Sequence, residues 1–271
     1  MKCMDFEFAG RTLSSFGMIV CKFDSGGLDT VDNGSRLSFN TVATLGGGHH
    51  KLTSVQYEDC LESVVQICKY SCTTDIQEIT PVEFRELTKW LNRKTFLKFK
   101  PLSEEYIDLY YEAKIDVSRI ELDGKLYGLE LTITTNTPFA LKEPKTLIIN
   151  NKAQDGKYFI NDTSYDEGFI YPYTEITIGD LIEIPEKERN LNIYNALEDR
   201  NTYVANVSTG EVITMNYPII QSSLSSHKIQ NDFNWNFFRI VNTYDNSRND
   251  LTISIPCTIK IKYSPIVKVG L

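Results

Sequence analysis

The second half of the sequence repeats one pattern from residue 146 onward: short segments in which apolar and polar residues alternate, separated by Gly, Asn, Asp and Pro. The segments are "TLIINN", "TEITIGDLIEI", "TYVANVSTGEVITM", "FNWNFFRIVN", "LTISI" and "TIKIKYSP". A period of two places alternate side chains on opposite faces of a β-strand, and the turn residues keep each strand short. A run of such strands predicts a β-sandwich or jelly roll.

The first half of the sequence is also rich in strand patterns. The opening "MKCMDFEFAGRTLSSFGMIVCKFD" alternates around a Gly-bearing turn and predicts a hairpin. The segments "FLKFKPL", "YIDLYYEAKIDVSRIEL" and "LYGLELTITTNTPFA" predict further strands, and Asp123-Gly124 predicts a tight turn between the last two. The 15 Tyr and 14 Phe of the chain favour strands as well.

One segment predicts a helix, "ITPVEFRELTKWLNRK". Thr80 is a favourable N-cap, Pro81 suits the first helical turn, and Glu83 completes the capping-box spacing. An apolar stripe follows at the helical spacing, formed by Phe84, Leu87 and Leu91. The stripe predicts that one face of this helix packs on a core.

Two prolines, Pro138 and Pro144, interrupt the strand pattern near the middle of the chain. They predict a boundary between an N-terminal domain, residues 1–140, and a C-terminal domain, residues 141–271. The predicted fold class is therefore mainly β, with one α-helix in the first domain and a β-sandwich in the second.

The charge and hydropathy of the chain argue against several partners. The net charge is −8, from 28 basic and 36 acidic residues, and no basic cluster occurs. Tight binding of nucleic acid needs clustered Lys and Arg, so we do not expect it. No apolar run approaches the length of a membrane span or a signal peptide. We expect no membrane insertion, and synthesis in a cytoplasm.

Few residues suggest chemistry. His49 and His50 follow three glycines and fit a solvated loop tip better than a metal site, and His227 lies among serines without a nucleophile motif. Cys68 and Cys72 could form part of a metal clip, but reduced, part-buried thiols are favoured for the six cysteines. Without a phosphate loop, a dinucleotide fingerprint or a zinc-protease helix, the sequence predicts no enzyme activity, no cofactor and no metal.

The segment "FNWNFFRIVN" has an aromatic residue at every second position, with Trp235 between Phe233 and Phe237. On a strand these rings would share one face, where Trp235 could stack on a sugar ring or could fill the core. Burial of such rings stabilises by about 1.5–3 kcal/mol each, which favours core packing. A carbohydrate-binding module, with Trp235 or the tyrosines of "GFIYPYTE" as a stacking platform, stays as the alternative.

The whole chain resembles the distal tail proteins of long-tailed bacteriophages. In the first half the resemblance rests on "FEFAGRTLSSFGMIV", "FRELTKWLNRKTFLKFKP" and "YYEAKIDVSRIELDGKLYGLELTITTNTPFA". In the second half it rests on "GFIYPYTEITIGDLIEI", "NVSTGEVITMNYPIIQSS" and "FNWNFFRIVNTYDNSRNDLTISIPCTIKIKYSP". These are structural patterns in a shared order rather than catalytic fingerprints.

The resemblance implies a structural virion protein at the tail tip. Its N-terminal belt domain would be similar to the tail-tube fold, a β-sandwich or split barrel with a helix, and would close into a homohexameric ring through which DNA passes. Its C-terminal domain would be a galectin-like β-sandwich. The implied partners are the major tail tube protein, a tail-associated lysin or tail fibre hub protein, and receptor-binding or baseplate proteins.

A Gly- and Asp-rich segment fits this arrangement. The stretch "SGGLDTVDNGSRLSFNTVATLGGGHHKLTS" is a poor core former and predicts an extended arm with edge strands. Such an arm could reach a neighbouring subunit or the tube protein, and ring contacts of this kind are heterologous. Its candidate residues are Asp24, Gly26, Gly27, Asp32, Gly46, Gly47 and Gly48. The galectin sugar-binding run His-x-Asn-x-Arg does not occur in the chain, which weighs against direct host-sugar binding.

Overall fold

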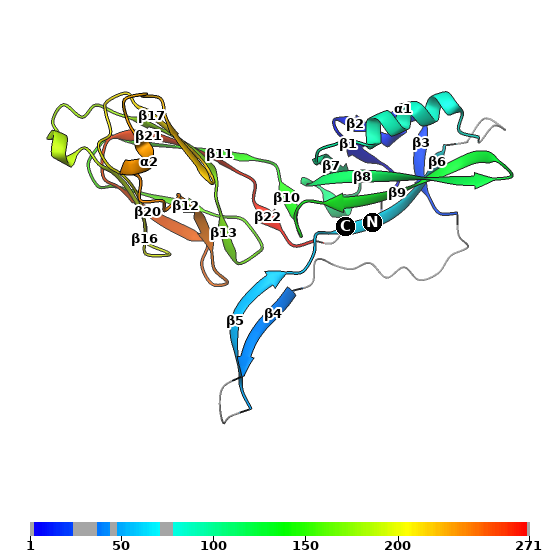
Figure 1. Ribbon diagram of the computed structural model, residues 1–271, viewed down its shortest axis with the longest axis horizontal. Coiled ribbons are helices and arrows are strands. Elements are labelled where there is room, and N and C mark those ends of the chain that lie inside the picture. Colours follow the sequence, from blue (N-terminus) through cyan, green and yellow to red (C-terminus); the bar gives the residue numbers. More distant parts are fainter. Residues whose placement is uncertain (1–2, 24–36, 44–47, 71–77, 270–271) are drawn as a thin grey trace. The chain divides into compact units, whose positions relative to one another are not determined.

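The structure, a computed structural model, describes residues 3–23, 37–43, 48–70 and 78–269. It is mainly β, as predicted, and forms two compact units (Figure 1). The N-terminal unit contains the residues up to 142 together with those from 267 onward, and the C-terminal unit contains residues 143–266. The chain returns to the first unit because β22 (Ile266–Val267) pairs with β10 (Ala140–Lys142). The sequence pattern assigned this return segment to the second domain.

The N-terminal unit is built on one antiparallel sheet with the strand order β2-β1-β7-β8-β9-β6-β3, and β10 pairs with β8. Its other strands are β1 (Phe6–Phe8), β2 (Arg11–Thr12), β3 (Met18–Cys21), β6 (Glu62–Lys69), β7 (Leu97–Pro101), β8 (Leu109–Leu122) and β9 (Lys125–Thr135). Two short 3₁₀ helices, η1 (Leu13–Phe16) and η2 (Glu104–Tyr106), connect them.

The predicted turn between β8 and β9 lies at Asp123 and Gly124. Their φ angles are 51° and 74°, and Leu122 pairs with Lys125. Two positive φ angles are typical of the tight hairpin turns that match the twist of the flanking strands, and Asp-Gly is a favoured sequence for them. This local signal therefore sets the register of the two longest strands.

Helix α1 (Pro81–Leu91) begins at the predicted capping box. The Thr80 hydroxyl accepts a hydrogen bond from the backbone N–H of Glu83 (3.3 Å), and the Glu83 carboxylate accepts one from the backbone N–H of Thr80 (2.7 Å). Lys69 Nζ lies 2.8 Å from the same carboxylate and so ties the helix start to β6. Partial burial alone would raise the pKa of Glu83, but the hydrogen bonds from Lys69 and Thr80 outweigh it and hold this pKa below its usual value.

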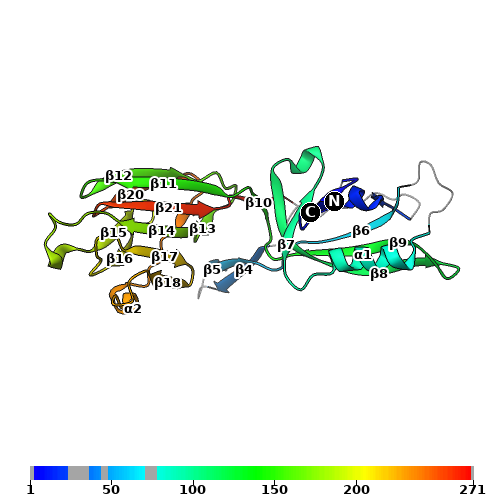
Figure 2. The ribbon, with the colours of Figure 1, turned by 90° about the horizontal axis from the view of Figure 1, so that it is seen from above.

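The buried face of α1 packs on the sheet beside β8, as Figures 1 and 2 show. Leu87, Trp90 and Leu91 are buried there. The Trp90 indole stacks on Phe16 with 4.4 Å between ring centroids, and its N–H donates to the carbonyl of Phe8 (2.8 Å). A buried indole N–H needs such a partner, so this bond fixes the helix against β1.

The C-terminal unit contains two larger sheets around one core. The first has the order β11-β21-β14-β17-β18 and the second the order β12-β20-β15-β16, while β13 and β19 form a separate pair. The bounds are β11 (Lys145–Asn151), β12 (Gly156–Asn161), β13 (Gly168–Ile170), β14 (Tyr173–Ile178), β15 (Leu191–Asn195), β16 (Arg200–Val204), β17 (Val212–Asn216), β18 (Ile219–Ser222), β19 (Ile240–Asn242), β20 (Arg248–Ile253) and β21 (Cys257–Tyr263), with η3 (Glu186–Glu188) and α2 (Ile229–Asp232) between strands. Alternate residues of the central strands fill the core, among them Ile176, Ile259, Ile193 and Leu251.

The predicted strand over "FNWNFFRIVN" is wrong for most of its length. Phe233 makes a single bridge with Val204, and a regular strand, β19, begins only at Ile240. Trp235 has a φ of 59°, which an extended strand does not allow. The alternating pattern of residues 233–239 therefore lies in an irregular loop and not in a strand.

The ion pair at the start of α1 predicts an acid-sensitive contribution to stability. Because the folded-state pKa of Glu83 is lowered, the stabilisation is present above the ordinary carboxyl pKa and is lost as pH falls through the folded-state value. A Glu83→Gln variant keeps a capping side chain but loses the charge, so it should be less stable than wild type near neutral pH, and this difference should vanish in acid. Urea unfolding at several pH values measures it, with the exposed Glu86→Gln of the same helix as control. A difference independent of pH would contradict this role.

Candidate interaction surfaces

A separate hairpin in the N-terminal unit carries an apolar face. Its strands, β4 (Leu37–Ala43) and β5 (His50–Tyr57), pair only with each other among the residues that the structure describes. Phe39 lies opposite Val55, and Leu37 opposite Tyr57. Because residues two apart share a face, these four side chains lie together. Ser38 and Asn40 lie on the other face, where Asn40 Nδ2 donates to Ser54 Oγ (3.0 Å).

Most of this apolar face is open to solvent. Phe39 is 60% exposed, Val55 43% and Leu37 39%. At the base of the hairpin, Tyr57 packs edge-on against Phe139 with 6.1 Å between ring centroids. A strand pair with one apolar face and free backbone edges normally finds a partner, since both features promote association.

Of the residues predicted for an inter-subunit arm, only Gly48 lies in the described part of the chain. Its φ is 62°, and it lies shortly before the first residue of β5. The other six, Asp24, Gly26, Gly27, Asp32, Gly46 and Gly47, lie outside the described residues. The sequence did anticipate edge strands in this region, but the amphipathic register of the hairpin is a finding of the structure.

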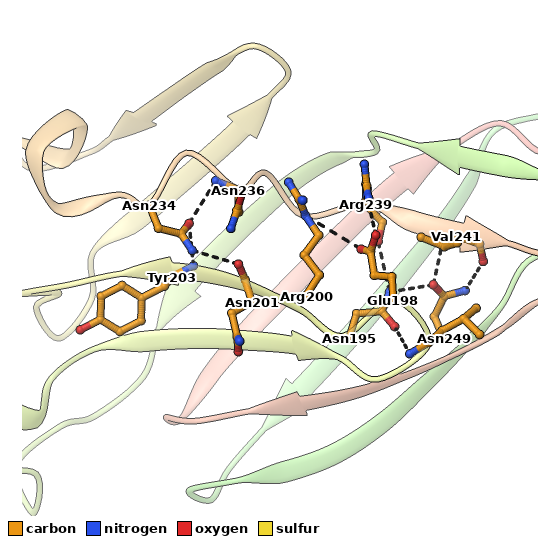
Figure 3. A network of polar contacts seen from close by, with 11 residues as sticks. Asn195, Glu198, Arg200, Asn201, Tyr203, Asn234, Asn236, Arg239, Val241 and Asn249 are labelled. Atoms are coloured by element: carbon orange, nitrogen blue, oxygen red, sulfur yellow. Dashed lines mark hydrogen bonds and ion pairs between the residues drawn. The ribbon is translucent and has the colours of Figure 1, made fainter. Parts of the chain in front are cut away.

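A second surface surrounds the loop 233–239 of the C-terminal unit (Figure 3). The Asn234 side chain holds this loop on β16. Its oxygen accepts from the backbone N–H groups of Tyr203 (3.2 Å) and Asn236 (3.1 Å), and its amide donates to the carbonyl of Asn201 (2.9 Å). Asn side chains compete in this way with regular strand pairing, which explains why the predicted strand does not form.

The same loop turns Trp235 outward. Trp235 is 56% exposed, whereas Phe233 and Phe237 are each 4% exposed. The preferred sequence-based interpretation, core packing of all three rings, is therefore wrong for Trp235 and correct for its two neighbours. The physical reason is the positive φ of Trp235, which removes it from the face that Phe233 and Phe237 share.

Trp235 begins a continuous row of aromatic rings, which we call the aromatic row: Trp235, Phe237, Tyr217, Tyr171 and Phe169. Successive ring centroids lie 6.4, 5.3, 4.1 and 5.3 Å apart. Tyr217 is 55% exposed and Phe169 53% exposed, so three rings of the row face solvent. Contacts at these distances stabilise the rings against one another and keep them in place.

A charged group lies at the end of the row. Arg239 Cζ is 4.3 Å from the centroid of the Phe169 ring, and Arg239 Nε donates to Glu198 Oε2 (2.6 Å). Arg200 Nε lies 4.0 Å from Glu198 Oε1. Partial burial alone would lower the pKa of Arg239, but hydrogen bonds to Glu198 and Tyr171 outweigh it and raise this pKa. Arg239 therefore stays charged.

Buried asparagines hold the backbone of Arg239 and its neighbours. Asn249 is fully buried, and its oxygen accepts from Asn195 Nδ2 and from the Val241 N–H, both at 2.8 Å. Its amide donates to the carbonyl of Val241 (2.8 Å). Asn195 Nδ2 also reaches the carbonyl of Arg239 (3.5 Å). Nothing in the sequence distinguishes these asparagines from the many that the chain carries on its surface.

His227 is a structural residue in the same unit. Its Nδ1 lies 2.5 Å from Oε1 of Glu211, which is fully buried, and its Nε2 lies 3.2 Å from Asp232. The Ser222 hydroxyl also donates to Glu211 (2.6 Å). This arrangement links β18 to α2 rather than forming a nucleophile with a base.

In the described ranges, no group of three or more His, Cys, Asp or Glu side chains could hold a metal ion. The helices that the structure describes include none with the length and hydropathy to cross a membrane.

Two family models match the chain. One, described as a phage tail protein N-terminal domain, matches residues 1–137, and the other, described as a phage tail C-terminal domain, matches residues 139–263. The chain belongs to this family of phage tail proteins. In sequence, no curated protein matches it significantly.

The tail protein also shares a fold with a solved structure. It is similar to the Dit protein of phage SPP1 with a TM-score of 0.60, over 97% of this chain and 99% of that chain, at 11% identity. That structure is described as a paradigm of the hub adsorption apparatus in phages that infect Gram-positive bacteria. The resemblance to distal tail proteins drawn from the sequence is thus confirmed in family and in fold.

Two aromatic residues of the loop, Phe237 and Trp235, should contribute to stability by different amounts. Phe237→Ala empties a core position and should lower the free energy of unfolding by about 3–5 kcal/mol. Trp235→Ala removes a ring that is more than half exposed and should lower it by less than about 1.5 kcal/mol, although it loses ring contacts with Phe233 and Phe237. Chemical denaturation of both variants measures the difference, and equal losses would contradict the exposed placement of Trp235.

Proposed function

We propose that this tail protein is the hub at the distal end of the phage tail, where copies of the chain close into a hexameric ring. The ring joins the tail tube to the proteins of the host-adhesion device, and DNA passes through its centre. Membership of the tail protein family and the Dit-like fold support this role. The role is structural and needs no catalysis.

The observation that carries the proposal is the uncovered apolar face of the β4–β5 hairpin. The register gathers Leu37, Phe39 and Val55 on one face, and that face is open to solvent in the single chain. Covering these side chains would stabilise an assembly by about 25 cal/mol for each Å² of apolar surface removed from water. We infer that the next copy of the chain covers this apolar face.

A ring would place the hairpin against a different surface of the neighbouring copy. In a cyclic assembly each subunit offers one surface forward and accepts a different surface behind, and the contacts repeat until the ring closes. The Gly-rich segment around residues 24–53, with Asp24, Gly26, Gly27, Asp32, Gly46, Gly47 and Gly48, would extend the same contact. An acidic protein, with a net charge of −8, would also not retain the phosphate backbone of passing DNA.

The partners follow from the same role. The tube protein would meet one face of the ring, and the tail-associated lysin or tail fibre hub protein the other. Receptor-binding or baseplate proteins would attach at the C-terminal unit. The protein is made in the cytoplasm of the bacterial host and works in the virion tail tip.

Loss of the apolar face should prevent assembly. The double variant Phe39→Ser/Val55→Ser should remain folded, since both side chains are exposed, but should weaken the contact between copies by at least about 2 kcal/mol, or roughly thirtyfold. Light scattering on the purified protein, alone and mixed with its tail tube protein, measures the mass of the assembly.

The matched control is Ile182→Ser, because Ile182 is an exposed apolar residue, 83% exposed, in the C-terminal unit. It should assemble as wild type does. If the hairpin variant and the control assemble equally well, the hairpin is not the contact between copies.

A further inference from the structure

We propose that the aromatic row of the C-terminal unit binds a glycan that carries carboxylate or phosphate groups, with its sugar rings on Trp235 and Tyr217 and its acidic groups on Arg200 and Arg239. A ring hub has no need of such a site, so this inference goes beyond the assembly role. It also stands independently of that role, since a single C-terminal unit contains every residue that the proposal uses.

The exposure of these rings to water costs free energy. Trp235, Tyr217 and Phe169 each expose more than half of their surface, although burial of a large apolar side chain is worth about 1.5–3 kcal/mol. Trp235 moreover keeps a positive φ, which is uncommon for a bulky residue. Trp235 and Tyr217 both pack on Phe237, and exposed apolar side chains that are gathered in this way favour a binding site.

The protein holds the rings of the aromatic row in a fixed arrangement before a ligand binds. Asn234 anchors the loop through three hydrogen bonds, the Tyr171 and Tyr217 rings lie parallel within 7° and 4.1 Å apart, and Phe237 supports Tyr217 from the core. A surface that is already ordered loses little conformational entropy when a ligand binds. Flat rings with one free face suit the flat apolar face of a sugar ring, and a phenol or indole edge adds a polar group.

The charges of Arg200, Arg239 and Glu198 favour an acidic ligand. Arg200 and Arg239 share one carboxylate, Glu198, so the group has one positive charge more than negative charges. Figure 3 shows both guanidinium groups on the same side of β16, toward the loop that carries Asn234 and Asn236. The guanidinium fork matches carboxylate and phosphate oxygens, which makes an acidic ligand complementary to this positive group in a chain whose net charge is −8.

The carboxylate of Asp199, the residue after Glu198 in the chain, does not lie on this side. Asp199 accepts a hydrogen bond from the Tyr194 hydroxyl (2.9 Å). Tyr194 lies between Ile193 and Asn195, which are buried, so strand alternation places its side chain on the opposite face of the sheet. Aromatic rings beside unbalanced guanidinium groups favour an acidic glycan over a neutral one.

Binding can be tested with the full chain on an array of bacterial surface glycans that includes neutral, uronate-bearing and phosphate-bearing chains. We expect signals from acidic glycans only, and the array separates the two sources of negative charge. For a glycan that binds, titration should change the fluorescence of Trp235, since the other tryptophan, Trp90, is 2% exposed. The affinity should fall as salt is added.

Matched variants test whether glycan binding takes place at the aromatic row. Trp235→Ala and Arg200→Gln should each weaken binding at least tenfold. The C-terminal unit offers a close control in Phe159, which is 56% exposed and carries Arg248 at 4.5 Å over its ring, outside the aromatic row. Phe159→Ala and Arg248→Gln should bind as wild type does.

Three results would overturn the proposal: no glycan is bound, neutral glycans bind as tightly as acidic ones, or the Phe159 and Arg248 controls lose as much affinity as the site variants. The assembly role is tested separately, because Trp235→Ala leaves the β4–β5 hairpin unchanged and should give wild-type mass in light scattering. A Trp235→Ala protein that binds glycans normally but no longer retains a tail partner would assign the row to protein docking instead.

Discussion

The rest of this structure depends on one constraint. The apolar face of each strand must pack against another element, so that its side chains are removed from water. In the C-terminal unit two sheets bury their inner faces in one core, and in the N-terminal unit α1 brings Trp90 and Leu91 onto the sheet. Among the described residues, the β4–β5 hairpin keeps an apolar face, with Leu37, Phe39 and Val55, that is open to solvent. Phe39 and Leu37 pair in register with Val55 and Tyr57, ahead of a bulge at Asn40/Thr41, and the lack of cover for this face within the described residues is the basis for proposing that another copy covers it.

Local signals in the sequence predicted much of the fold. Thr80, Pro81 and Glu83 act within one helical turn, and Asp123-Gly124 acts within one hairpin turn, so neither depends on the rest of the chain. Period-two alternation predicted the sandwich strands for the same reason. The return of the chain through β22 depends on a long-range pairing with β10, and no local pattern encodes it.

The candidate surfaces were harder to predict, and the loop around Trp235 shows why. Its alternation is that of a strand, but Asn234 bonds to its own neighbours and to β16, and Trp235 takes a positive φ. The competition between a side-chain amide and the strand ladder is decided by geometry that a single sequence does not display. The buried Asn195 and Asn249 are similar, since in sequence they do not differ from surface asparagines. For the segment around residues 37–57, the sequence predicted edge strands, and the structure added the apolar face of the hairpin. Its role as an arm between subunits stays a prediction.

The two surfaces belong to different units and have different chemistry. The hairpin of the N-terminal unit offers exposed aliphatic and aromatic side chains, whereas the C-terminal unit offers aromatic rings beside guanidinium groups. This division fits a hub that assembles through one unit and meets its surroundings through the other.

The most direct measurement of the central claim is a cryo-electron microscopy reconstruction of the tail tip of the virion. We predict a six-fold ring of this chain at the distal end of the tube, with Phe39 and Val55 buried against the next copy. A ring in which the apolar face of the hairpin stays in solvent, or a tail tip without a ring of this chain, would contradict the account.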